Sequence, residues 1–130
     1  MDITPLVPEG RQIIEGYGNG GFRIGGTVHA GSILVFPDRS ESWPVASFEA
    51  MTLAALAPVI EAGRSGAVEL LLLGCGNRLA PVPPPIRAAL KEAGVAVEPM
   101  DTGAACRTYN VLMAEGRRVA AALIAVASAS

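Results

Sequence analysis

Residues 68–73 have the sequence VELLLL and are followed directly by GCG at residues 74–76. Five of the six residues in the run are apolar, so it lacks the alternation typical of a strand with one face in water. A short apolar run that ends at a glycine is typical of a strand covered on both faces, as in the parallel sheets of α/β proteins. We therefore predict that residues 68–73 form a buried central strand.

Helix and strand patterns alternate around this run. Residues 83–94 read PPPIRAALKEAG, with proline at the entrance and glycine at the end, and they predict a helix at residues 86–93. Similar signals predict a helix at residues 53–62 capped by Thr52, and Pro58 either kinks this helix or delays its start. They also predict a strand at residues 95–98 and a helix at 103–114 capped by Thr102. Residues 119–126 form either a strand, favoured by the Val and Ile content, or a short helix, favoured by the Ala content. With the last segment as a strand, this order implies two right-handed crossovers and a largely parallel sheet.

The first 45 residues have the composition of short strands separated by glycine turns. An Asn-Gly step at residues 19–20 lies between the apolar segments 12–17 and 22–24, which predicts a hairpin. A second pair is expected at residues 27–30 and 32–36, and residues 43–45 suit a short edge strand because they contain Pro44. We therefore predict a β-meander in this part of the chain.

Composition limits the class of protein. The chain has 130 residues, 51% of them apolar, and a formal net charge of −2. This length suits a single domain over residues 1–130, with residues 1–11 as a flexible N-terminal segment, and the apolar content excludes disorder. The absence of a basic excess and an aromatic content of 5% argue against nucleic acid as a partner.

Targeting signals and membrane segments are not visible in the sequence. The first residues show no basic segment followed by an apolar run, so we expect no signal peptide and no mitochondrial presequence. The longest nearly apolar stretch, residues 119–127, is shorter than the roughly 20 residues that a membrane helix needs. Cys75 and Cys106 are then expected to be reduced thiols, and the chain to be cytoplasmic.

The chain offers few residues for metal or nucleophilic chemistry. Two cysteines and the single His29 are too few for a zinc site of the usual Cys and His spacing. The glycine-rich segment 16–26 lacks the Gly-Lys-Ser/Thr ending of a phosphate-binding loop and is interpreted as a hairpin. No nucleophile, base and orienting group can be assembled from local spacing. We expect no metal and no cofactor, and whether the chain is an enzyme stays open.

Two loops follow predicted neighbouring strands and mark the candidate site. In open α/β sheets ligands bind beyond the carboxyl ends of the strands, so the loops at residues 74–78 and 99–108 are expected to share one edge. Glycines permit close backbone approach, and a helix that starts there favours an anion such as a carboxylate or a phosphate. The candidate ligand-binding residues are Gly74, Cys75, Gly76, Arg78, Asp101, Thr102, Cys106, Arg107, Thr108 and Asn110.

Each candidate also has a structural interpretation. Asp101 is either a general base or a residue that stabilises the start of a helix. Cys106 is either a thiolate favoured by the first helical turn or a buried core thiol, and a redox pair with Cys75 is a further alternative. Arg78 and Arg107 either clamp an anion or pair with acidic side chains of the chain itself.

Several segments resemble a known family. Residues 17–24 (YGNGGFRI), 69–76 (ELLLLGCG) and above all 100–112 (MDTGAACRTYNVL) are similar to the domain of unknown function found in mitochondrial complex I assembly factor 3 and in the adipogenesis-associated archaeal-type domain protein. The resemblance implies a three-layer α/β fold with a mixed sheet, a β-rich N-terminal part and a C-terminal strand. The family often has Gly-Thr-Gly where this chain has Gly-Cys-Gly at residues 74–76, which weakens a catalytic role for Cys75.

The resemblance implies no established enzymatic activity. Its mitochondrial member assembles a respiratory complex by contacting other proteins. We therefore expect a non-catalytic binding or assembly module with a protein partner. The alternative is a protein, or an enzyme, that binds a small anionic ligand between the loops at residues 74–78 and 100–108.

Overall fold

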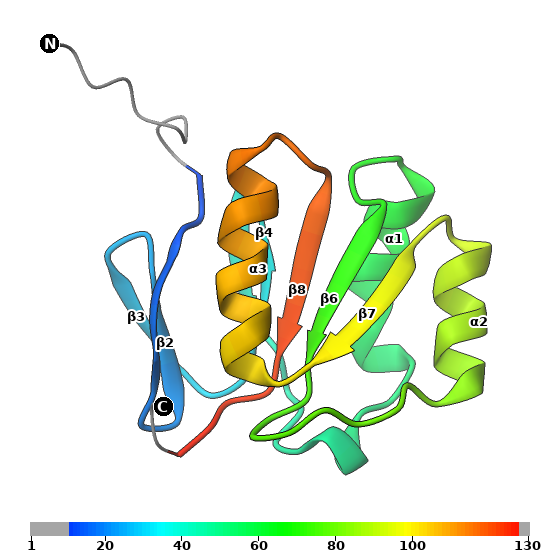
Figure 1. Cartoon of the computed structure of the whole chain (residues 1–130). Helices are drawn as coiled ribbons and strands as arrows, with labels where there is room; N and C mark the ends of the chain where they lie inside the picture. The colour runs from blue at the N-terminus through cyan, green and yellow to red at the C-terminus, as the bar shows by residue number, and fades with distance from the viewer. Residues whose placement is uncertain (1–10, 128–130) are drawn as a thin grey trace, which may run out of the picture.

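The computed structural model of the chain describes residues 11–127, which form two β-sheets and three α-helices (Figure 1). Residues 1–10, most of the segment predicted to be flexible, lie outside the described part. The smaller sheet is antiparallel and contains three strands in the order β1-β2-β3. Its strands are β1 (Ile14–Gly18), β2 (Gly21–Ile24) and β3 (Thr27–Ala30).

The larger sheet has five strands in the order β5-β4-β8-β6-β7. β6 runs parallel to β7 on one side and to β8 on the other, whereas β4 runs antiparallel to β8 and β5. The predicted α/β fold with a mixed sheet is therefore confirmed. The five strands are β4 (Ile33–Phe36), β5 (Arg39–Ser42), β6 (Leu70–Gly74), β7 (Ala96–Met100) and β8 (Val119–Leu123).

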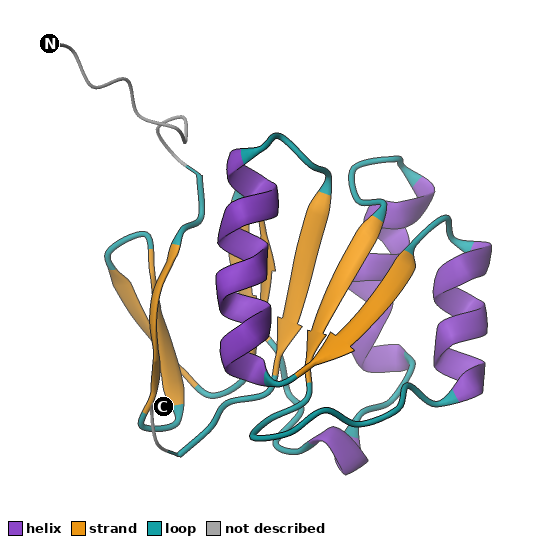
Figure 2. Ribbon diagram, in the orientation of Figure 1, coloured by secondary structure: helices purple, strands orange, loops and turns teal. Residues whose placement is uncertain are grey.

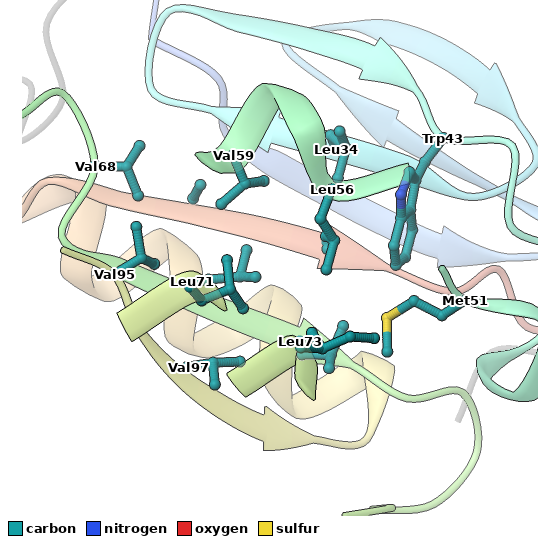
Figure 3. Close-up of a cluster of buried hydrophobic side chains, with 14 of the residues drawn as sticks. Leu34, Trp43, Met51, Leu56, Val59, Val68, Leu71, Leu73, Val95 and Val97 are labelled. Atoms are coloured by element: carbon teal, nitrogen blue, oxygen red, sulfur yellow. The ribbon is translucent and has the colours of Figure 1, made fainter. Parts of the chain in front are cut away.

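Helices cover both faces of the larger sheet (Figure 2). Helices α1 (Ala57–Arg64) and α2 (Pro84–Glu92) pack with Leu71 and Leu73 of β6 on one face, where Figure 3 shows the buried cluster. Helix α3 (Thr102–Ala114) and the small sheet pack with Leu72 on the other face. Because successive residues of β6 point to opposite faces and both are covered, the run at residues 68–73 had to be almost continuously apolar.

The first of the two predicted N-terminal strand pairs forms and the second does not: β1 pairs with β2 around Asn19 and Gly20, as the hairpin signal predicts. The expected pair of residues 27–30 and 32–36 does not form, because β3 pairs with β2 through a Gly25-Gly26 turn and β4 enters the larger sheet. The meander is thus limited to β1, β2 and β3. Both turn glycines have positive φ, which a two-residue hairpin turn requires.

The predicted edge strand at residues 43–45 is wrong. Trp43 instead lies in the core, 3% exposed, and its indole N–H donates to the carbonyl of Ala55 at 2.9 Å. The strand at this edge is β5, whose sequence RSES is too polar to have been recognised.

The first helix starts later than the predicted residue 53, in agreement with the alternative that Pro58 suggested. Short 3₁₀ helices lie at Phe48–Ala50 and Ala54–Leu56, and α1 begins at Ala57 with Pro58 in its first turn, where no N–H is needed. The Thr52 hydroxyl accepts a hydrogen bond from the N–H of Ala55 at 3.3 Å, so it caps the 3₁₀ turn instead of α1.

None of the helices in residues 11–127 is long and apolar enough to cross a membrane.

Candidate functional site

The loop after β6 and the start of α3 lie side by side at the carboxyl edge of the parallel strands. The N–H of Thr102 donates to the carbonyl of Gly76 at 2.8 Å, and the N–H of Gly76 donates to the Thr102 hydroxyl at 3.0 Å. The N–H of Cys75 donates to the carbonyl of Met100 at 2.8 Å. The two loops singled out in the sequence therefore share one edge, as parallel neighbours must.

A third segment, directly after β8, is bound to the same point. The Thr102 hydroxyl donates to the carbonyl of Ile124 at 2.8 Å, and the N–H of Ile124 donates to the carbonyl of Gly74 at 3.0 Å. Thr102 is fully buried, so both hydrogen bonds of its hydroxyl lie in the interior. One side chain thus joins the ends of β6 and β8 to the start of α3.

The glycines at this edge have structural reasons to be glycine. A Cβ at Gly74 would lie 3.1 Å from the Cα of Thr102 and 3.0 Å from the side chain of Leu123, so a larger residue would force α3 away from the sheet. Gly76 has a φ of +104°, a conformation that other residues rarely adopt. Close packing of α3 on the sheet therefore accounts for glycine at residue 74, and the approach of a ligand is not needed to explain it.

Asp101, and not Thr102, caps α3. Its Oδ1 accepts a hydrogen bond from the N–H of Ala104 at 2.8 Å, and its backbone is extended, as at an N-cap. The predicted cap at Thr102 is wrong by one position, because the Thr102 hydroxyl is turned into the sheet edge. Asp101 thus stabilises the start of α3, which is the structural one of its two interpretations from the sequence.

Both cysteines are buried and free. Burial raises the pKa of Cys106 to about 12, although the nearby Arg107 lowers it in part. Burial likewise raises the pKa of Cys75, whose Sγ lies 3.5 Å from the carbonyl oxygen of Leu73. Desolvation therefore outweighs the thiolate stabilisation expected from the first turn of a helix, which opposes the proposed redox pair.

Arg78 and Arg107 are exposed and form no ion pair within residues 11–127. The Arg107 guanidinium lies over Gly103, where an added Cβ would be 3.3 Å from its Nη1 and would collide with the Tyr17 hydroxyl. Tyr17 of β1 therefore covers the first turn of α3, a role that the sequence did not suggest.

The last two candidates lie away from this edge. Asn110 is on the second half of α3, where its amide accepts from the N–H of Ile14 at 2.9 Å and donates to the carbonyl of Ile14 at 2.8 Å. The Asn110 amide therefore holds main-chain groups of β1. Thr108 is half-buried on the same helix.

Tyr109 is a buried polar residue that sequence reasoning did not single out. It is fully buried between α3 and the sheet, and its hydroxyl has no hydrogen-bond partner among residues 11–127. Burial raises its pKa well above the ordinary value. Its signal in the sequence was the position three residues after Cys106, on the face of α3 that packs on the sheet.

Acidic, histidine and cysteine side chains do not gather into a metal-binding group of three anywhere in the part of the chain that the structure describes.

The family model for a protein of unknown function, DUF498/DUF598, matches residues 14–124. An uncharacterised protein of Rhodobacter capsulatus is 44% identical over 111 residues, which cover 85% of this chain and 82% of that protein. The NADH dehydrogenase [ubiquinone] 1 alpha subcomplex assembly factor 3 of Xenopus tropicalis is 38% identical over 85% of this chain. The match covers 60% of that assembly factor's own length.

The fold is also found among solved structures. A Bordetella pertussis protein described as a Mth938-like domain superposes with a TM-score of 0.84. It is 29% identical, and the superposition covers 99% of this chain and 95% of that one.

Replacement of the Thr102 hydroxyl tests its role at the sheet edge. In Thr102→Val the buried N–H of Gly76 and carbonyl of Ile124 lose their partner, which should lower the free energy of unfolding by about 3 kcal/mol. Thr102→Ser keeps the hydroxyl and should lose about 1 kcal/mol, while Thr108→Val should change stability by less than about 0.5 kcal/mol. Urea unfolding of the three variants measures these differences, and equal losses in Val and Ser would contradict this role of the hydroxyl.

The burial of Cys106 predicts a pH dependence. An unfolded thiol loses its proton near pH 8.5, whereas the folded one keeps it to about pH 12, so the free energy of unfolding should fall between these pH values. The fall attributable to Cys106 approaches about 1.4 kcal/mol per pH unit. Cys106→Ala, compared with the unsubstituted protein in urea at pH 8 to 10, should lack this part of the slope. The same slope in both proteins would show that the thiol is not desolvated.

Proposed function

The chain belongs to the DUF498/DUF598 family of proteins of unknown function, and we propose that it is a non-catalytic module that binds another protein during assembly of a multi-subunit complex. The observation that carries this proposal is the similarity to NADH dehydrogenase assembly factor 3 over 85% of the chain. Because the chain spans about 60% of that relative, the similarity concerns the shared fold.

The closed carboxyl edge supports a binding role over a catalytic one. Thr102 and the main chain of Gly74, Gly76 and Ile124 use their hydrogen-bonding groups on one another. The main-chain and hydroxyl groups that could bind a substrate at this place in an α/β sheet are therefore already engaged. Contact with a partner then falls to the outer surface of the molecule.

The two free cysteines support the cytoplasm as the compartment that we propose, because reduced thiols persist there.

Affinity capture with substituted surfaces tests the proposed module. The exposed apolar side chains available for contact are Val28, 68% exposed, Leu79, Val111, Leu53 and Ile13. We expect the tagged chain to recover the same subunit or assembly intermediate in replicate captures from its own organism. Each of these residues is replaced by lysine in a separate variant. The variant whose lysine lies in the interface should recover about tenfold less partner, and the variants whose lysine lies outside it serve as controls. No reproducible partner of the unsubstituted chain would contradict the proposal.

A second candidate function is binding of a small anion at the carboxyl edge. It is favoured by two exposed guanidinium groups that form no ion pair in the described chain, that of Arg78 in the loop after β6 and that of Arg107 beside Gly103 in the first turn of α3. Arginine suits carboxylate and phosphate because its fork donates two parallel hydrogen bonds.

Thermal unfolding with phosphate or citrate tests this second candidate. Either anion should raise the midpoint of unfolding through binding to the folded state alone, and Arg107→Ala should abolish the rise. Arg64→Ala, which removes an exposed arginine from the end of α1, should keep it. A rise of equal size in all three proteins would indicate a general salt effect and contradict a site at Arg107.

A further inference from the structure

Within residues 11–127, strand β3 is an edge of the small sheet that no other strand pairs with. The N–H of Gly31 donates to the carbonyl of Gly20 at 2.7 Å, and because antiparallel pairs alternate, the main chains of Phe22 and His29 also face each other. The N–H and C=O groups of Val28 and Ala30 consequently point away from β2. No hydrogen bond within residues 11–127 occupies them.

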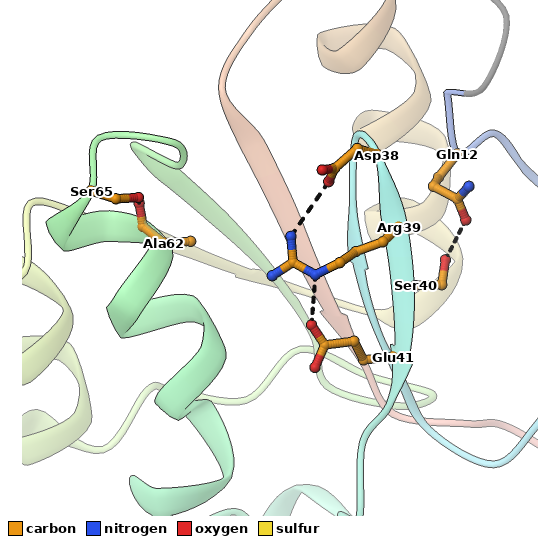
Figure 4. Close-up of polar contacts among 7 residues, drawn as sticks. All are labelled: Gln12, Asp38, Arg39, Ser40, Glu41, Ala62 and Ser65. Carbon is orange, nitrogen blue, oxygen red and sulfur yellow. Dashed lines mark hydrogen bonds and ion pairs between the residues drawn. The ribbon is translucent and has the colours of Figure 1, made fainter.

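Three other sheet edges are covered or guarded. The outward carbonyl of Val97 in β7 accepts from Arg87 at 3.3 Å, and Pro99 offers no N–H. β5 carries Arg39 and Glu41, which pair with each other at 2.7 Å (Figure 4).

The last of these three edges, β1, is occupied by the side-chain amide of Asn110, which forms hydrogen bonds with both main-chain groups of Ile14. β3 has no charge and no proline, and Val28 is 68% exposed. Proteins commonly guard edges because an unguarded edge pairs with another strand.

A hollow of about 340 Å³ lies on the outer face of the same sheet. The rows Gly16–Arg23–Val28 and Gly18–Gly21–Ala30 form this face, whereas Phe22 in the neighbouring row is buried against α3. No residue of α3 lines the hollow. Gly16, Gly18 and Gly21 contribute only backbone to its lining, whereas Arg23 and Val28 contribute side chains.

The hollow has a cationic wall. Arg23 is exposed and forms no ion pair within residues 11–127. An aromatic side chain that lies across cross-strand glycines buries their bare backbone, and a carboxylate beside it would neutralise Arg23. β3 itself, whose sequence is TVHA, has neither a phenylalanine, tyrosine or tryptophan side chain nor a carboxylate to offer to a second copy.

We propose that an extended segment of the partner protein adds to β3 as a fourth strand, with an aromatic side chain over the glycines of the hollow and an acidic side chain at Arg23. This inference rests on the proposed function, since it names the surface by which the module holds its partner. Strand addition supplies main-chain hydrogen bonds to Val28 and Ala30, and the hollow supplies specificity through alternate side chains.

A peptide titration tests the surface directly. The probe is a terminally blocked heptapeptide in which Asp, Tyr and Asp alternate with Thr, added to the whole chain while amide exchange is followed by NMR. At saturation, exchange of the Val28 and Ala30 amides should slow by about tenfold, because each gains a hydrogen bond. Val28→Pro removes one outward donor without touching the ladder to β2, and Arg23→Glu reverses the wall's charge; each should weaken binding by about tenfold.

Matched controls separate the surface from general effects. Ser42→Pro removes an outward amide from β5, and Arg64→Glu reverses a charge on α1; both should bind the peptide like the unsubstituted chain. Unchanged exchange at Val28 and Ala30, or equal weakening by Ser42→Pro, would overturn the proposal. Protection of these amides in a self-associated chain without peptide would also overturn it, because the occupant would then be a second copy.

The partner capture distinguishes this proposal from the function on which it rests. Loss of the captured partner with Val28→Pro, and its retention with Ser42→Pro, would support the β3 surface. Equal retention with both would overturn the β3 surface and leave the binding module standing. Failure to capture any partner with the unsubstituted chain would overturn the module.

Discussion

The hydroxyl of Thr102 is the interaction on which the arrangement of the molecule depends. It accepts from Gly76 and donates to Ile124, and thereby joins the ends of β6 and β8 to the first residue of α3. A helix held at its first residue and packed on a sheet has little freedom along its length. The position of α3 in turn places Asn110 against β1, and these hydrogen bonds attach the small sheet to the rest of the chain.

This arrangement explains why the edge at which α/β proteins usually bind ligands is occupied by the protein itself. Gly74 permits the close approach of α3, and Asp101 caps the helix from outside. The main-chain groups without a partner within residues 11–127 lie instead at the outer edge of the small sheet, on β3. Of the sheet edges in residues 11–127, β3 has no covering side chain, charge or proline, and it borders a hollow lined in part by glycine.

The sequence predicted the core of the fold where the signal was local. The apolar run at residues 68–73 and the Pro and Gly boundaries of α2 each follow from their own residues. The Asn-Gly step likewise predicted the pairing of β1 with β2. The partners of β3 and β4 were not predicted, because the sequence signal indicated a nearby turn and did not specify which strand each would pair with. The polar strand β5 was missed, since RSES has no apolar face to reveal it. Thr102 and Asp101 are adjacent and both suit a cap, so only the three-dimensional contact with Ile124 separates their roles.

Native-state hydrogen exchange at the amides of Gly76 and Ile124 tests the central claim most directly. If Thr102 holds the three segments as one unit, these amides exchange only when the whole chain unfolds, with an opening free energy equal to that of global unfolding. Exchange of either amide through a local opening of much lower free energy, while the amides of Leu71 and Leu72 stay protected, would contradict it.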